Sequence, residues 1–250
     1  MQLRRALSSA QSGEILIPRV EAALASREWE TFTVTIKGPK KDRKPDGWFH
    51  PSTHPLWDEA ALYYYLTAPD KLILEPFDST SWQAVSAGTF WHAFISPILV
   101  KSGVLIEQDV PVSDPEVGSR GEMDGVLKGP KGNEGCEFKT MNSRKMDKIP
   151  KGGPSTPEVL QWFMETCPVY VAQADEYLRI SGLPAMRFLI GSTEYPFKKR
   201  EILLPYNEHR ANQTRDKYRR VRQAVDDGRP PLGCGKKSMD CPARAICGCP

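Results

Sequence analysis

The stretch EGCEFKT, residues 134–140, has the alternating pattern of a β-strand and organises the interpretation of the whole chain. Side chains of a strand point to opposite faces in turn, so Cys136 and Phe138 share one face while Glu137 and Lys139 share the other. The first face suits a protein core. The second places an acid next to a base, which a strand built only for packing would not need.

A second strand is predicted immediately before it, in GEMDGVLKG (121–129), and the turn-forming sequence PKGN joins the two segments. In this strand Met123 and Leu127 are expected on one face and Asp124 on the other. If the apolar faces of the two strands align, Asp124 lies beside Glu137. The pattern therefore predicts a β-hairpin with two carboxylates close together.

Carboxylates a few ångströms apart repel each other, and a divalent cation between them relieves the repulsion. Lys139 could then orient or deprotonate a water molecule and neutralise charge on a reacting phosphate. These residues outline metal-assisted phosphodiester hydrolysis. The alternative is a surface Glu–Lys pair on an amphipathic strand, and the hairpin alone does not separate the two interpretations.

The order Asp124, then Glu137-x-Lys139, resembles the D…(D/E)xK signature of the PD-(D/E)XK nuclease superfamily. GTFWHAF (88–94) lies before the hairpin, and its His92 resembles the G-x-x-x-H motif of the RecB-like branch, whose histidine contributes to the metal site. The alternative for a histidine in an apolar helix is a hydrogen-bonded core residue.

QADEY (173–177) follows the hairpin and matches the Q-x-x-x-Y motif of RecB-like domains. Gln173 and Tyr177 are four residues apart and share one helix face. In the family this motif lies near the site and the DNA. A Gln–Tyr pair without that context would be an ordinary helix surface.

Four of the six cysteines crowd the last seventeen residues: Cys234, Cys241, Cys247 and Cys249. In a reducing compartment such a cluster favours a metal site over a disulfide framework. Related exonucleases, including the CRISPR-adaptation family, hold an iron–sulfur cluster there. The spacing leaves three possibilities open, namely a [4Fe-4S] cluster, Zn²⁺, or thiols without a metal.

The cluster-bearing relatives take their first cysteine ligand from a position that falls near Trp57 here, and this chain has no cysteine there. Four ligands would have to come from the terminal cysteines alone or include His50 or His54.

The resemblance implies a metal-dependent DNA exonuclease that hydrolyses phosphodiester bonds at DNA ends. It implies Mg²⁺ or Mn²⁺ held by Asp124, Glu137, the backbone carbonyl of Phe138 and His92. Lys139 would act on the attacking water, and Gln173 and Tyr177 would hold the DNA. The alternatives are an endonuclease of the same fold, an RNA-cleaving relative, or a non-catalytic nucleic-acid-binding module with a structural metal.

The predicted fold class is α/β, with a central mixed sheet flanked by helices as in restriction endonucleases, and a small metal-bound cysteine tail. Strands are expected over 103–112, 121–129, 134–140, 186–192 and 200–205, and helices over 58–66, 82–101, 157–181 and 208–227. The expected divisions are an N-terminal extension and basic linker (1–47), a nuclease core (48–228) and the tail (229–250).

The 250-residue chain carries a net charge of only +3, but its bases gather in three runs, at 37–44, 144–151 and 210–222. Such runs suit a polyanion such as DNA, although each one alone could be a solvated face. No segment is long or apolar enough to span a bilayer or serve as a signal peptide. We therefore expect a cytoplasmic protein without a membrane partner.

Overall fold

The computed structural model describes residues 13–26, 45–73, 79–194, 198–233 and 241–247. Its centre is a five-stranded sheet with the strands side by side in chain order. They are β1 (Leu105–Asp114), β2 (Ser119–Gly129), β3 (Gly132–Met141), β4 (Ala185–Ser192) and β5 (Lys199–Pro205). β3 and β4 run parallel and the other neighbours are antiparallel. The predicted mixed sheet is confirmed.

The predicted hairpin is β2 and β3, which pair from Gly125 opposite Cys136 to Gly129 opposite Gly132. The two-residue periodicity of β3 is also confirmed, because Cys136 and Phe138 are buried in one core cluster while Glu137 faces the other side of the sheet. A parallel connection from β3 to β4 needs a long crossover, and helices supply it.

The helices are α2 (Leu16–Ser26), α3 (Glu59–Thr67), a 3₁₀ turn η1 (Pro69–Lys71), α4 (Ser79–Lys101), α5 (Ser143–Met146), α6 (Pro157–Thr166), α7 (Pro168–Ser181) and α8 (Glu208–Asp226). Asp58 begins α3, since its side chain accepts a hydrogen bond from the backbone N–H of Ala61 at 2.8 Å. The helical segment expected over 157–181 forms two helices, which meet at Cys167 and Pro168. Gly182, with φ of 72°, ends α7.

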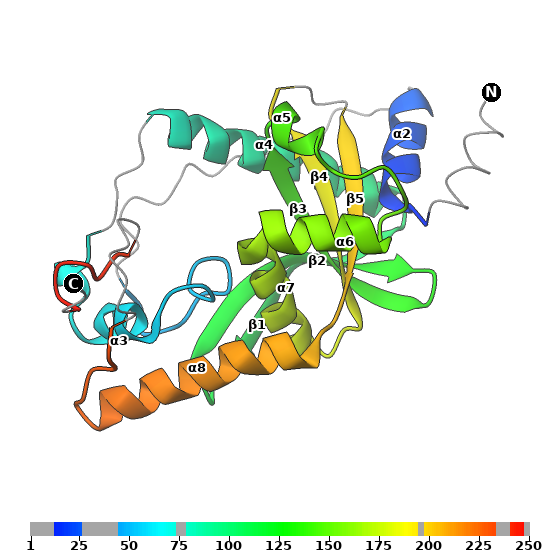
Figure 1. Cartoon of the computed structure of the whole chain (residues 1–250). Coiled ribbons are helices and arrows are strands. Elements are labelled where there is room, and N and C mark those ends of the chain that lie inside the picture. The colour runs from blue at the N-terminus through cyan, green and yellow to red at the C-terminus, as the bar shows by residue number, and fades with distance from the viewer. Residues whose placement is uncertain (1–12, 27–44, 74–78, 195–197, 234–240, 248–250) are drawn as a thin grey trace.

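Helices cover both faces of the sheet (Figure 1). α6 and α7 form one core cluster with the sheet, and α2 and α4 form a second cluster on the opposite face. α8 packs along α7 and α3. The sheet is thus held between two helical layers, and its middle strand β3 lies between them.

The N-terminal helix α2 joins this core through a buried ionic network. Arg187 of β4 is 1% exposed and lies between Glu134, at 2.7 Å, and Glu201, at 3.0 Å. The Glu201 carboxylate also accepts hydrogen bonds from the backbone N–H groups of Ile15 and Ile17 at the start of α2. It therefore satisfies N–H groups that the helix itself leaves unpaired. Part of the predicted N-terminal extension is a packed element of the core.

The expectation that Met123 and Leu127 share a face is wrong. Met123 packs in the cluster of α6 and α7, whereas Leu127 packs in that of α2 and α4. The register of the neighbouring strand β1 shifts between Leu105 and Glu107. Such a bulge bends and twists a strand pair locally, and so the simple alternation fails.

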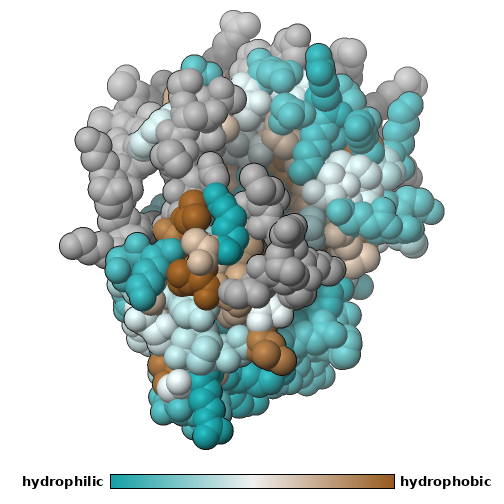
Figure 2. All heavy atoms as spheres, turned by 60° about the vertical axis from the view of Figure 1, so that its left-hand side comes forward, coloured by the Kyte–Doolittle hydropathy of each residue, from teal (hydrophilic) through white to brown (hydrophobic). Residues whose placement is uncertain are grey.

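The face turned forward in Figure 2 carries hydrophobic side chains in separate patches between hydrophilic ones. Within the described ranges, no helix combines the length and the apolar character that crossing a bilayer requires.

Candidate active site

Glu137 and Lys139, which share one face of β3, form a direct ion pair. The distance from Lys139 Nζ to Glu137 Oε2 is 2.6 Å. The exposed fraction of the side chain rises from 1% at Glu137 to 18% at Lys139 and 33% at His92. The group is therefore buried at the glutamate and opens to solvent at the histidine.

Asp124 lies across the strand pair from these residues, as the hairpin argument predicted. Its Oδ2 accepts a hydrogen bond from the backbone N–H of Phe138 at 2.6 Å, and its own backbone N–H contacts Glu137 Oε1 at 3.4 Å. The hairpin register thus brings both carboxylates and the lysine together.

α4 carries His92 to the same place. The helix packs closely because Trp91 rests on Gly191 of β4, where a Cβ atom would lie 2.6 Å from the indole ring. His92 Nδ1 is 3.8 Å from Asp124 Oδ1, and its ring centroid is 5.3 Å from that of Phe138. The histidine borders the carboxylates at the solvent side.

α7 supplies Gln173 and Tyr177 from one helix face. The side-chain amide of Gln173 donates to Glu137 Oε2 and to the hydroxyl of Tyr177, both at 3.3 Å. Tyr177 packs against Gly121 of β2, where any Cβ would lie 2.8 Å from the ring. Gln173 thus contacts the acid of β3 directly, while Tyr177 acts on it through Gln173.

Burial and mutual repulsion perturb the titration of the carboxylates. Burial raises the pKa of Asp124 to about 6, and burial together with the charge of Asp124 raises that of Glu137 to about 7. Burial opposes the charge on Lys139, but the two carboxylates outweigh it and raise its pKa. Burial lowers the pKa of His92, which favours the neutral imidazole.

The donor set suits a hard divalent cation, because two adjacent carboxylates are costly to ionise without one and a neutral imidazole stands beside them. Across residues 13–26, 45–73, 79–194, 198–233 and 241–247, however, no three His, Cys, Asp or Glu side chains are spaced to hold a metal together. Asp124 and Glu137 would supply part of a ligand set, and Mg²⁺ commonly completes its shell with water. The residues fit as a partial site.

Tyr170 is a neighbour of the site that the sequence interpretation missed. Its ring centroid is 5.3 Å from Lys139 Nζ, a cation–π distance, and it lies on α7 one turn before Gln173. The sequence did carry a signal for Tyr170: it lies three residues before the Q-x-x-x-Y motif and on the same helix face.

The tail is described only over residues 241–247, so Cys234 and Cys249 lie outside the described residues. Cys241 is buried and Cys247 packs beside it. Cys241 Sγ is 3.6 Å from Asp58 Oδ2, at the start of α3. The tail cluster, its metal and its ligands stay predictions.

The basic run 37–44 also lies outside the described residues, whereas the run 210–222 forms most of α8. Several of its arginines pair within the molecule: Arg210 with Asp175, Arg215 and Arg219 with Glu116, and Arg220 with Glu59. Much of the positive charge of α8 is therefore paired with carboxylates of other parts of the fold.

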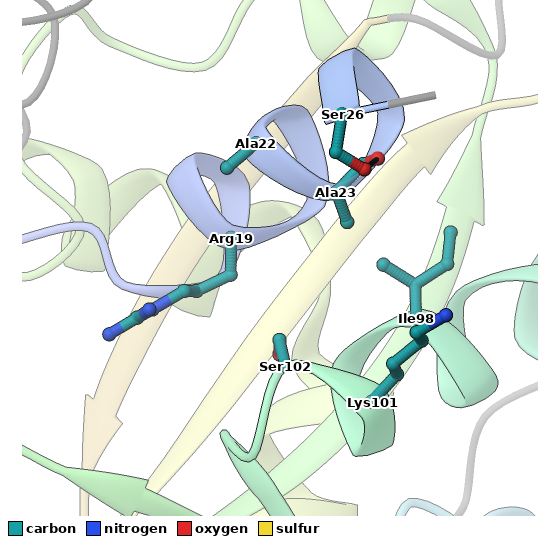
Figure 3. A pocket seen from close by; sticks show the side chains of 7 residues that line it. All are labelled: Arg19, Ala22, Ala23, Ser26, Ile98, Lys101 and Ser102. Carbon is teal, nitrogen blue, oxygen red and sulfur yellow. Dashed lines mark hydrogen bonds between the residues drawn. The ribbon is translucent and has the colours of Figure 1, made fainter. Parts of the chain in front are cut away.

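A hollow of about 230 Å³ lies between α2 and the end of α4, away from these residues. Ala23 and Ser26 face Ile98 and Lys101 across it (Figure 3). It contains none of the predicted site residues.

No protein-family model matches this sequence, and no curated protein matches it either. Among solved structures, the alkaline exonuclease LHK-Exo from Laribacter hongkongensis gives a TM-score of 0.50 at 12% identity, over 73% of this chain and 89% of that one. LHK-Exo in complex with dAMP gives 0.46 at 12% identity, over 88% and 91%. At this identity the likeness concerns the fold: the chain has an α/β fold similar to that of a nuclease.

Proposed function

We propose that this protein is a metal-dependent deoxyribonuclease that hydrolyses phosphodiester bonds. The observation that carries the proposal is the meeting of Asp124, Glu137 and Lys139 at one point of the hairpin, with His92 at its open side. Two carboxylates beside a lysine form a set that phosphodiester hydrolysis uses and that a structural core does not need.

In this proposal Asp124 and Glu137 hold Mg²⁺ or Mn²⁺, with the Phe138 carbonyl and His92 as further ligands. The cation would supply positive charge to the phosphate as negative charge develops on it. Gln173 fixes the Glu137 carboxylate by its hydrogen bond at 3.3 Å. Tyr177 in turn orients that amide, and both side chains would border the DNA.

Lys139 is proposed to position the attacking water and remove its proton. In the described structure the carboxylates raise its pKa and burial acts in the opposite direction. Once the carboxylate charge is neutralised, the main influence that raises the pKa of Lys139 is lost, and burial shifts that pKa downward against the weaker effect of Tyr170. Lys139 can therefore be positively charged while the two carboxylates are ionised, and it can accept a proton once their charge is neutralised.

We further propose that the enzyme acts on DNA ends. LHK-Exo, which shares the fold, is an alkaline exonuclease. Endonuclease action, action on RNA, and binding without cleavage are the alternatives.

The function is tested by incubating purified protein with linear duplex DNA, circular DNA, single-stranded DNA and RNA. The expected result is loss of linear DNA with Mg²⁺ or Mn²⁺, protection in EDTA, and protection of the circle. Cutting of the circle would favour an endonuclease. DNA binding without degradation under every metal condition would refute the catalytic proposal and favour a binding module.

For the tail, we propose a structural metal site formed by Cys234, Cys241, Cys247 and Cys249, with [4Fe-4S] preferred to Zn²⁺. Supporting it, Cys241 and Cys247 lie in one small cluster against α3. Anaerobically purified protein is expected to contain about four iron atoms per chain, with a visible thiolate–iron band.

Cys247→Ser is expected to lose most of this metal and to melt at a lower temperature, because structural metal binding contributes folding energy. Cys167→Ser, at a buried cysteine outside the tail, serves as the matched control and should keep its metal. About one zinc per chain would replace the iron assignment. A metal-free parent would end the proposal.

A further inference from the structure

A groove of about 420 Å³ lies between α7 and α8 and reaches the loop before α3. We call it the α7–α8 groove. α8 contributes polar and charged side chains to it. The loop, α6 and α7 contribute apolar ones, together with Asp175 of α7, which pairs with Arg210. The lining that matters here is Leu56, Met164, Pro168, Gln213, Lys217 and Arg220.

The charge that sets this groove apart is Lys217. Its ammonium donates to the backbone carbonyls of Pro55 and Trp57, the latter at 3.0 Å. Within the described part of the chain no carboxylate pairs with it, unlike Arg210 and Arg220. An ammonium has three donors, so one N–H remains for an oxygen of a ligand. The groove thus offers a partly buried cation with a donor to spare.

One wall of the groove offers apolar surface to solvent. Leu56 is 51% exposed and Met164 is 38% exposed, and Pro168 is exposed beside them. Because Lys217 bonds to the residues on either side of Leu56, its ammonium lies beside this apolar wall. An apolar wall beside a cation suits a ligand with both a planar ring and an anionic group. A nucleotide has both.

The groove and the candidate active site lie on two faces of the same helix, α7. Pro168, Val171, Ala172 and Asp175 line the groove and form one i, i+3, i+4, i+7 stripe of the helix. Tyr170, Gln173 and Tyr177 occupy the opposite face of the helix, so α7 separates the groove from the candidate active site. A strand leaving the site has to pass only around one helix, about 10 Å in diameter, to reach the groove.

We propose that the α7–α8 groove binds a nucleotide of a single-stranded segment of the DNA substrate, with its phosphate on Lys217 and its base against Leu56 and Met164. This inference rests on the proposed nuclease function and adds a subsite to it. The occupant is single-stranded because a base can lie on the apolar wall only when it is unpaired.

The test measures binding of a fluorescent oligothymidylate of about a dozen nucleotides, in EDTA, by anisotropy. Gln213→Glu and Leu56→Glu place negative charge in the groove at exposed positions, where folding is little affected. Lys131→Glu is the control, because it changes charge in the exposed β2–β3 turn, at the far end of β3 from the site. The groove variants are expected to bind about fivefold or more weakly than the control, with duplex binding reduced less.

Groove variants that bind the oligonucleotide within about twofold of Lys131→Glu would overturn the inference, as would equal losses for single strand and duplex. The two proposals fail separately. If the protein degrades DNA in a metal-dependent way and the groove variants bind DNA unchanged, only the groove proposal is refuted. If the groove variants lose binding as expected but the protein degrades no DNA, the groove proposal stands and the nuclease proposal is refuted.

Discussion

Lys139→Ala is expected to lower the rate of DNA degradation by about 1000-fold or more while leaving DNA binding nearly intact. Lys139 is the one base on the β3 face that carries Glu137, and its Nζ lies 2.6 Å from Glu137 Oε2. Removing a group that stabilises or relays charge in the transition state typically costs a factor of this size. Degradation of end-labelled linear DNA in Mn²⁺ and in Mg²⁺ is the measurement.

Lys131→Ala provides the control, since it deletes a lysine from an exposed turn on the same hairpin. Thermal melting distinguishes chemistry from folding, because Glu137 loses its ion-pair partner in the variant. If Lys139→Ala folds like the parent and retains more than about one tenth of its rate, Lys139 is not the group that acts on the water.

Arg187→Ala is expected to destabilise the protein by about 3–5 kcal/mol, the largest effect on stability that we predict. Arg187 is 1% exposed and lies between two glutamates that are themselves nearly buried. Its removal leaves those carboxylates without a counter-charge, which is the costly way to break a buried ion pair. The free energy of unfolding, obtained from urea titrations, measures the effect.

Arg200→Ala is the matched control, because Arg200 lies on the adjacent strand β5 and is exposed. Its expected cost is within about 0.5 kcal/mol. A loss below about 1 kcal/mol at Arg187 would mean that the network contributes little to the free energy of unfolding.

The hairpin could be predicted from the sequence because its information is local. The alternation of EGCEFKT and the turn at PKGN set the partners of β2 and β3, and the pairing then carries Asp124 to Glu137. His92 and Gln173 come from separate helices, so only the motif resemblance pointed to them. The structure places both beside the hairpin carboxylates.

Other features depend on residues far apart in the chain, which a local pattern cannot pair. Arg187 is a single charge in an otherwise apolar strand, and nothing near it in the sequence indicates Glu134 or Glu201. The helix α2 was missed although Leu16 and Val20, four residues apart, are both fully buried. Met123 was assigned to the face of Cys136 and Phe138, although only Leu127 packs there, because the distortion of the strand pair arises in another strand.

The carboxylate of Glu201 that receives α2 also sets an order of events during synthesis. Its bonds to Ile15 and Ile17 span 186 and 184 residues. During synthesis α2 therefore cannot be seated until the chain through β5 has followed it. Contacts of such long range form late in folding. Until then the face of α2 that carries Leu16 and Val20 stays uncovered. Exposed apolar surface of this kind makes a nascent chain prone to aggregation.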